Sequence, residues 1–146
     1  MDSDERPYGV HLTVDGYDGD RALLGSEQVV RSAVRELVDR LELIPISELV
    51  STELTAEVYA SHLDSRPDEA SEQVGISAGI QILQSHIHLH TYSARGVLFA
   101  DLFVCGDLDA DLALSLLRCR FRLESFDHML VRRGLRFHRP TAVARE

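Results

Sequence analysis

The alternation of hydrophobic and polar residues predicts the first elements of the chain. Residues 8 to 14 alternate, and Asp15-Gly16 begins a turn, so we expect a strand there. Apolar residues then recur at helical spacing, with Ser26 as a possible cap and Pro45 at the far end. The residues that predict this helix are Val30, Ala33, Val34, Leu37, Val38 and Leu41.

Strand patterns dominate the middle of the chain. Residues 48 to 60 are rich in threonine and valine and alternate roughly, which predicts a strand. A polar loop is expected from 61 to 73. Strand signals resume at 74 and continue to 83.

Two further strands, 85 to 92 and 97 to 105, read as a hairpin joined by Ser93-Ala94-Arg95-Gly96. Asp109 can then cap a second helix, and a last strand is expected near 124 to 132. The apolar stripe of that helix is Ala110, Ala113, Leu114, Leu117 and Phe121.

This order of elements predicts the fold class. One strand, one helix, four strands, a second helix and a last strand favour an α+β fold. We expect a two-layer sandwich, with a mainly antiparallel sheet and two helices on one face. The sequence shows no internal repeats, so residues 1 to 146 are expected to form a single domain.

Charge and composition narrow the range of partners. A net charge of -9 disfavours nucleic acid and anionic membranes, and no apolar run has the length of a membrane span. The acidic first five residues do not resemble the basic start of a signal peptide, so we expect a cytoplasmic protein. Cys105 and Cys119 form no CxxC pair and are expected to stay reduced.

The 15 basic residues are all arginine, and the sequence has no lysine. This excludes a lysine Schiff base to pyridoxal phosphate and a Walker-type phosphate loop. If the protein handles amines through an imine, the carbonyl group must come from another source.

Several residues that could take part in catalysis lie close together in the segment from 84 to 92. In a strand, His86, His88 and His90 lie on one face together with Tyr92. If Tyr92 faces Val97 across the hairpin, His90 lies opposite Phe99, His88 opposite Asp101, and Cys105 opposite Gln84. Histidine, aspartate and thiol would then gather around the Gln84-Ser85 peptide.

Alternating histidines are also compatible with a metal site. Two imidazoles at i and i+2 on a strand can both reach Zn²⁺, and Asp101 could be a third ligand. This alternative leaves the serine and the cysteine without a role, and we expect no bound metal. Some of the other histidines should be core or rim residues: His11, His62, His128 and His138.

The segment QSHIHLHT, followed by DLFVCGD, resembles the self-cleaving S-adenosylmethionine decarboxylase family in its short bacterial form. That family has a serine followed by a histidine five residues later and a cysteine twenty residues later. Ser85, His90 and Cys105 match both intervals, and Ser77 matches a family serine eight residues before the cleavage serine. The opening YGVHLTVDGYDGD is similar to the family's first strand and turn.

The resemblance implies a proenzyme that cuts itself between Gln84 and Ser85. Ser85 Oγ would attack the Gln84 carbonyl to give an ester, which Ser77 would stabilise. His90 would remove the Ser85 α-proton, so that elimination and hydrolysis leave a pyruvoyl group and ammonia. The products would be chains 1–84 and 85–146.

The resemblance also implies what the pyruvoyl cofactor does. Its ketone would form an imine with the amine of a small substrate and accept the electron pair as carbon dioxide leaves. Cys105 would reprotonate the product carbon. A structural alternative for Cys105 is a small buried hydrophobic residue, and Cys119 is assigned to that role.

Three departures from the family pattern concern cleavage and substrate. Gln84 replaces the usual glutamate, which removes a negative charge but not the attacked backbone carbonyl. Ala94 stands where the family carboxylate holds the ribose, and an acidic stretch from 68 to 73 replaces an aromatic segment. The candidate substrate-binding residues are therefore Tyr92, Ala94 and Glu72.

Two substrate classes stay open. One is S-adenosylmethionine, for polyamine and spermidine biosynthesis, in a rearranged nucleoside pocket; the other is a small basic amino acid such as L-arginine or L-ornithine. A different class of function is a non-catalytic regulatory subunit or a histidine-rich metal-binding protein. The resemblance also implies a homodimer of processed protomers.

Overall fold

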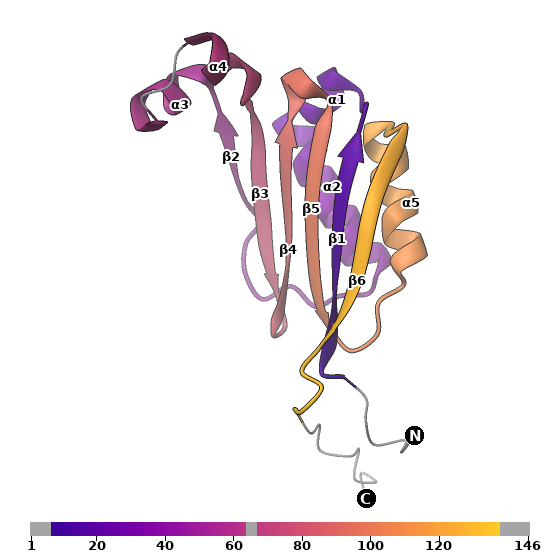
Figure 1. Ribbon diagram of the computed structural model, residues 1–146. Helices are drawn as coiled ribbons and strands as arrows, with labels where there is room; N and C mark the ends of the chain where they lie inside the picture. Colours follow the sequence, from indigo (N-terminus) through magenta and orange to yellow (C-terminus); the bar gives the residue numbers. More distant parts are fainter. Residues whose placement is uncertain (1–6, 64–66, 138–146) are drawn as a thin grey trace, which may run out of the picture.

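The computed structural model describes residues 7–63 and 67–137. Figure 1 shows one twisted sheet with the two longest helices packed on one face. The strands are β1 (Gly9–Tyr17), β2 (Val50–Leu54), β3 (Gly75–Ile82), β4 (Ser85–Tyr92), β5 (Val97–Cys105) and β6 (Ser125–Arg133). Their spatial order is β2-β3-β4-β5-β1-β6, and every neighbouring pair is antiparallel. The predicted α+β class and antiparallel sheet are confirmed.

The two predicted helices are present as α2 (Glu27–Arg40) and α5 (Ala110–Phe121). Each begins where a side chain accepts a hydrogen bond from the first turn. Ser26 Oγ accepts from the Val29 amide at 3.2 Å, and Asp109 Oδ1 accepts from the Leu112 amide at 3.0 Å. Both capping predictions are therefore confirmed.

Short helices depart from the sequence prediction. The strand expected over 48 to 60 is wrong after Leu54, because α3 (Ala56–Leu63) follows. Thr55 Oγ1 accepts a hydrogen bond from the Val58 amide at 3.3 Å and so caps this helix. The polar loop expected from 61 to 73 is wrong as well, since it contains the end of α3 and α4 (Pro67–Glu72), with proline in the first helical position.

A further helix, α1 (Arg21–Leu24), was not predicted, because four residues are too few to show helical spacing. The prediction of two helices is therefore correct for the layer on the sheet but omits the short helices. Figure 1 shows α3 and α4 beyond one end of β2 and β3, away from the face covered by α2 and α5. None of the helices in residues 7–63 and 67–137 is long and apolar enough to cross a membrane.

The hydrophobic core lies between the sheet and helices α2 and α5. Alternate residues of the central strands point into it, because side chains alternate between the two faces of a sheet. Its fully buried members include Leu12, Ile87, Leu89, Leu102, Leu37, Leu117 and Phe121. The opposite face of the sheet, which we call the open face, is covered by neither α2 nor α5 (Figure 1). On β1 and β4 the side chains that point to this face are mostly polar.

Thr91 is a buried polar residue at the end of β4, with 3% of its surface exposed. Its hydroxyl accepts a hydrogen bond from the Ile76 amide at 2.9 Å and donates one to the Leu24 carbonyl at 2.7 Å. A Cβ at Gly75 would collide with the Thr91 carbonyl oxygen, so the two strands can approach this closely only with glycine there. Thr91 therefore ties α1 to β3 and β4, the strands that carry Ser77 and His90.

We predict that Thr91→Val destabilises the protein by about 1–3 kcal/mol, because two buried backbone groups lose their partner while the side-chain shape is kept. Thr91→Ser is the matched control, since it keeps the hydroxyl. Urea unfolding followed by circular dichroism measures both variants. If valine proved as stable as serine, the bridge would contribute nothing to stability.

Candidate active site

The open face carries the three predicted histidines of β4. His88 and His90 are exposed and His86 is half-buried, whereas Ile87 and Leu89 point into the core. The predicted hairpin register is also correct: Tyr92 pairs with Val97, and His88 with Asp101. The alternation of the sequence thus identified both the face and the neighbours of each histidine.

The proposed cleavage site is a tight turn between β3 and β4. Ile82 pairs with Ser85, so that Leu83 and Gln84 alone make the connection. Gln84 has φ 57°, in the left-handed region, which costs a residue with a Cβ roughly 1–2 kcal/mol. The Ser85 hydroxyl donates to the Leu83 carbonyl at 3.3 Å. The carbonyl that the sequence predicts as the target of Ser85 therefore belongs to a strained residue at an exposed end of the sheet.

Cys105 is the last residue of β5, and its side chain is exposed. The paired residues of β4 and β5 end at His86 and Phe103. The same register, continued by two residues, puts Cys105 opposite Gln84. The thiol and the cleavage turn therefore lie at the same end of the sheet, and the alternative of a buried Cys105 is wrong. Cys119, assigned to the buried hydrophobic role, is exposed as well.

Ser77 and His90 form a second group further along the sheet. They are directly opposite each other on β3 and β4, and Ser77 Oγ and His90 Nδ1 share a hydrogen bond of 2.9 Å. Although part of the His90 ring reaches solvent, the protein around it removes enough water to lower its pKa; the neighbouring His88 lowers the pKa further, while Asp101 acts in the opposite direction. A lowered pKa keeps the imidazole neutral and able to accept a proton.

The two groups are far apart within one chain. Ser85 and His90 are five residues apart on one extended strand, which corresponds to about 16 Å along the strand. Ser77 and Ile82, the partners of His90 and Ser85, have the same spacing on β3. The histidine next to the cleavage turn is therefore His86, and His90 cannot reach Ser85 in this arrangement.

Each group borders a cavity on the open face. Ser77 and His90 line one of about 470 Å³ together with His88, Gly79 and Glu48. The cleavage turn lines another of about 380 Å³, whose walls include Gln84, Ser85, His86, His88 and Phe103. Both cavities are large enough for part of a small substrate.

The predicted substrate-binding residues are only partly brought together. Tyr92 packs on Phe99, with ring centroids 5.5 Å apart, and lines a cavity of about 260 Å³. Ala94 lies in the 3₁₀ turn Ser93–Arg95 and is exposed, as is Glu72 at the end of α4. Neither Ala94 nor Glu72 lines this cavity, but Gln73 and Arg95, the next residues in the sequence, do, together with Tyr17 of β1. Sequence reasoning missed these three because they come from separate parts of the chain.

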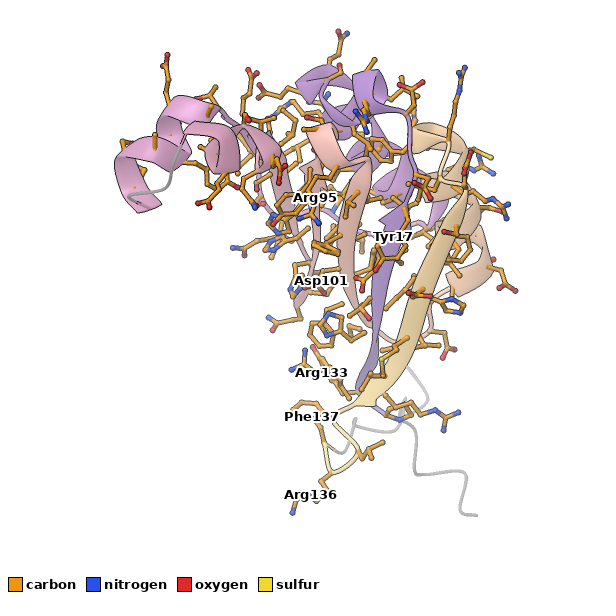
Figure 2. All side chains as sticks on the ribbon, turned by 45° about the horizontal axis from the view of Figure 1, so that its top comes forward. Tyr17, Arg95, Asp101, Arg133, Arg136 and Phe137 are labelled. Atoms are coloured by element: carbon orange, nitrogen blue, oxygen red, sulfur yellow. The ribbon has the colours of Figure 1, made fainter. Side chains whose placement is uncertain are left out.

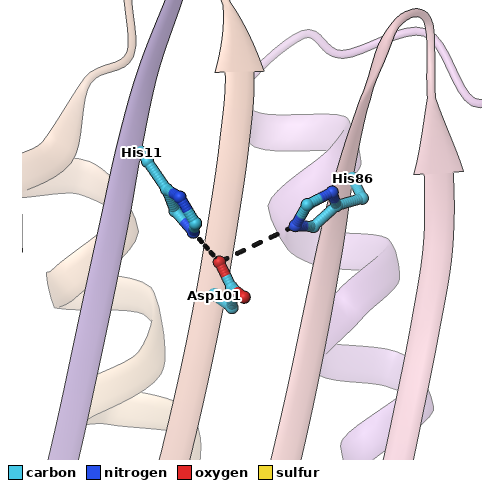
Figure 3. A group of neighbouring side chains, drawn as sticks. All are labelled: His11, His86 and Asp101. Atoms are coloured by element: carbon cyan, nitrogen blue, oxygen red, sulfur yellow. Dashed lines mark hydrogen bonds and ion pairs between the residues drawn. The ribbon is translucent and has the colours of Figure 1, made fainter. Parts of the chain in front are cut away.

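Asp101 does not contact the histidine opposite it. Its carboxylate is hydrogen-bonded to His11 Nε2, and the same oxygen lies 3.7 Å from His86 Nε2 (Figure 3). His11 was expected at a core or rim position, and its link to Asp101 depends on the pairing of β1 with β5. Figure 2 shows Asp101 and Arg133 on the open face, where the Arg133 guanidinium lies 4.4 Å from the centre of the Phe103 ring.

These features define an α+β protein whose antiparallel sheet has Ser85 beside a tight turn at one end and the hydrogen-bonded pair Ser77 and His90 further along. A family model described as S-adenosylmethionine decarboxylase matches residues 10–134, and the chain belongs to this family. The S-adenosylmethionine decarboxylase proenzyme of Archaeoglobus fulgidus is 28% identical over 127 residues, which cover 86% of this chain and 97% of the relative. The corresponding proenzyme of Picrophilus torridus is 27% identical, with 86% and 84% covered.

A solved structure has the same architecture. The adenosylmethionine decarboxylase from Aquifex aeolicus superposes with a TM-score of 0.69, covering 88% of this chain and 92% of that chain. The sequences are 19% identical, so this likeness establishes the fold alone. The family resemblance inferred from the cleavage motif is confirmed.

We predict that His90 titrates below the ordinary histidine pKa of 6.5, and that His88→Gln raises its pKa by removing a neighbouring positive charge. Because folding lowers this pKa, the unfolded chain binds more protons, and stability should fall as the pH drops below 6.5. NMR titration of the imidazole resonances measures the shift. His128→Gln is the control on β6, and an equal effect of both variants would contradict the assignment.

Proposed function

We propose that the chain is a self-processing, pyruvoyl-dependent decarboxylase that cuts itself between Gln84 and Ser85. The observation that carries this proposal is the match of Ser77, Ser85, His90 and Cys105 to the spacing of the family to which the chain belongs. The strained turn at Gln84 and the hydrogen bond between Ser77 and His90 support it.

In the processing reaction, Ser85 Oγ attacks the Gln84 carbonyl, and the bond from that carbonyl to the Ser85 nitrogen breaks. The result is an ester and a free amino group. Cleavage of the turn releases Gln84 from its left-handed conformation, which favours the forward direction. Ser77 stabilises the ester, and the neutral imidazole of His90 accepts the Ser85 α-proton that elimination releases.

The distance of about 16 Å between Ser85 and His90 requires more than one chain. We propose a homodimer in which two open faces pack against each other, so that His90 of the partner subunit reaches the cavity that the cleavage turn and Ser85 line. A two-fold interface uses the same patch on both copies, so two such sites form together. Exposed apolar side chains on the open face support this packing: Val50 is 66%, Phe99 40%, Met129 64% and Val131 43% exposed.

The processed protein needs room and a proton donor at residue 85. Once formed, the pyruvoyl group supplies a carbonyl that accepts the electron pair left by carbon dioxide. The cavity of about 380 Å³ beside Ser85 fits a substrate there. The exposed Cys105 thiol, at the same end of the sheet, holds the proton that the product carbon receives.

The substrate is an amino acid or its derivative, with two candidates. S-adenosylmethionine is the first, because the similar proenzymes carry its name. L-arginine or L-ornithine is the second, because Ala94 offers no carboxylate for a ribose and Glu48 places a negative charge at the cavity beside His90. We place the reaction in the cytoplasm, where Cys105 stays reduced.

We predict that the wild-type protein yields fragments 1–84 and 85–146, the second with a blocked N-terminus. Ser85→Ala should remain whole and inactive, because no hydroxyl can attack Gln84. A denaturing gel and intact mass spectrometry measure both. Cys119→Ala is the control and should cleave normally. Only full-length wild-type protein would instead fit a regulatory subunit or a metal-binding protein.

We predict that Ala94→Glu improves kcat/KM for S-adenosylmethionine by roughly tenfold, which corresponds to about 1.4 kcal/mol from hydrogen bonds to two ribose hydroxyls. Ala60→Glu adds the same charge at an exposed position of α3 as a control. Carbon dioxide release is measured with S-adenosylmethionine, arginine, ornithine and lysine. Efficient wild-type use of S-adenosylmethionine that Ala94→Glu leaves unchanged would show that another residue binds the ribose.

A further inference from the structure

Three potential metal ligands converge on the open face from three neighbouring strands. His11 lies on β1, Asp101 on β5 and His86 on β4 (Figure 3). One ligand atom of each side chain lies within 4.8 Å of the others. This group is separate from the hydrogen-bonded pair Ser77 and His90, and neither the processing reaction nor decarboxylation uses His11 or His86.

The geometry of the group suits a small divalent ion. Both imidazoles direct Nε2 toward the same Asp101 carboxylate oxygen (Figure 3). In a tetrahedral site with bonds of 2.0–2.1 Å, ligand atoms are about 3.3 Å apart. The 3.7 Å between His86 Nε2 and Asp101 Oδ1 is close to that spacing. The hydrogen-bonded His11 and Asp101 would have to separate to admit an ion between the three atoms.

A hydrogen bond alone accounts for only part of this arrangement. It explains why His11 contacts Asp101. It does not explain His86, whose Nε2 points at the same oxygen from 3.7 Å, which is an ion-pair distance and too long for a hydrogen bond. A ligand shared by all three side chains accounts for both orientations.

The surroundings hold the two rings in place and leave the site open. His11 and His86 both pair with Phe103 across the sheet, and their rings lie 5.9 and 5.8 Å from its centre. In the single chain the side chains are 23%, 31% and 40% exposed for His11, His86 and Asp101, so an ion can enter from solvent before two open faces pack together. The His88 ring, 4.8 Å from that of His86, lies near enough to become a further ligand.

Arg133 acts against any cation at this position. Its guanidinium lies 4.4 Å from the centre of the Phe103 ring, and the His11 and His86 rings lie 5.9 and 5.8 Å from the same centre. Like charges at such separations repel, so Arg133 should weaken the site rather than abolish it. This makes Arg133 a useful probe, because its removal should change affinity in the opposite direction to removal of a ligand.

We propose that His11, His86 and Asp101 form a binding site for a divalent first-row transition-metal ion. Two histidines and one carboxylate with open positions are typical of both Zn²⁺ and non-haem Fe²⁺ sites. An ion here joins β1, β5 and β4 directly beside Ser85. This differs from the sequence expectation that no metal is bound.

The test is titration of the full chain, freed of metal with a chelator, with Co²⁺ followed by visible absorption and with Zn²⁺ followed by calorimetry. We expect one ion per chain. His11→Ala and the nearly isosteric Asp101→Asn should each weaken binding at least tenfold, whereas His128→Ala on β6 should leave it unchanged. Arg133→Gln should tighten it. Metal analysis of protein expressed with both iron and zinc distinguishes the two ions.

The proposal is overturned if no saturable binding occurs, or if Co²⁺ binds His11→Ala and Asp101→Asn as tightly as the wild type. It is also overturned if His90→Ala abolishes binding while His11→Ala does not, because the ion would then be bound by His90 and not by the group around Asp101. Circular dichroism of each variant establishes that it is folded. The uncleavable Ser85→Ala should bind the ion normally, so this test does not depend on decarboxylase activity.

Discussion

The fixed rise of an extended strand is the constraint on which the rest of this structure depends. β4 advances about 3.3 Å per residue and alternates its side chains between two faces. That alternation buries Ile87, Leu89 and Thr91 under the helices and leaves the histidines on the open face. The same rise holds Ser85 and His90 apart, and the strand cannot fold back without breaking its pairing with β3 and β5. Stability and separation of the catalytic groups therefore have one cause.

Local patterns in the sequence were sufficient for much of the fold. Ser26 and Asp109 identified the helix starts because a capping side chain acts within one turn, and the hairpin register followed from a short connection. The alternation of residue types that predicts a strand at Val50–Leu54 continues into the next segment. That segment is nevertheless helix α3, whose first turn is capped by Thr55. Alternation alone could not separate these outcomes, because the two segments share their residue types.

In the candidate site too, contacts between residues near in sequence were predicted, and contacts between distant segments were not. Ser77 and His90 were found from their spacing, and the hydrogen bond between them agrees with paired roles. His11 was not found, because its approach to Asp101 requires β1 to pair with β5 across most of the chain. The spacing of Ser85 and His90 could be read from the sequence. That the two residues are too far apart to react within one chain is clear only because the structure places both on one extended strand, β4.

The central claim is that His90 processes Ser85 of a second copy, and mixed dimers test it most directly. A tagged His90→Ala chain is co-expressed with an untagged Ser85→Ala chain, neither of which matures alone. In a mixed dimer, the tagged chain keeps Ser85 and receives His90 of the partner subunit. The account predicts that the tagged chain yields the mature 85–146 fragment with a blocked N-terminus. A tagged chain that gives no such fragment, although mixed dimers are isolated through the tag, would contradict it.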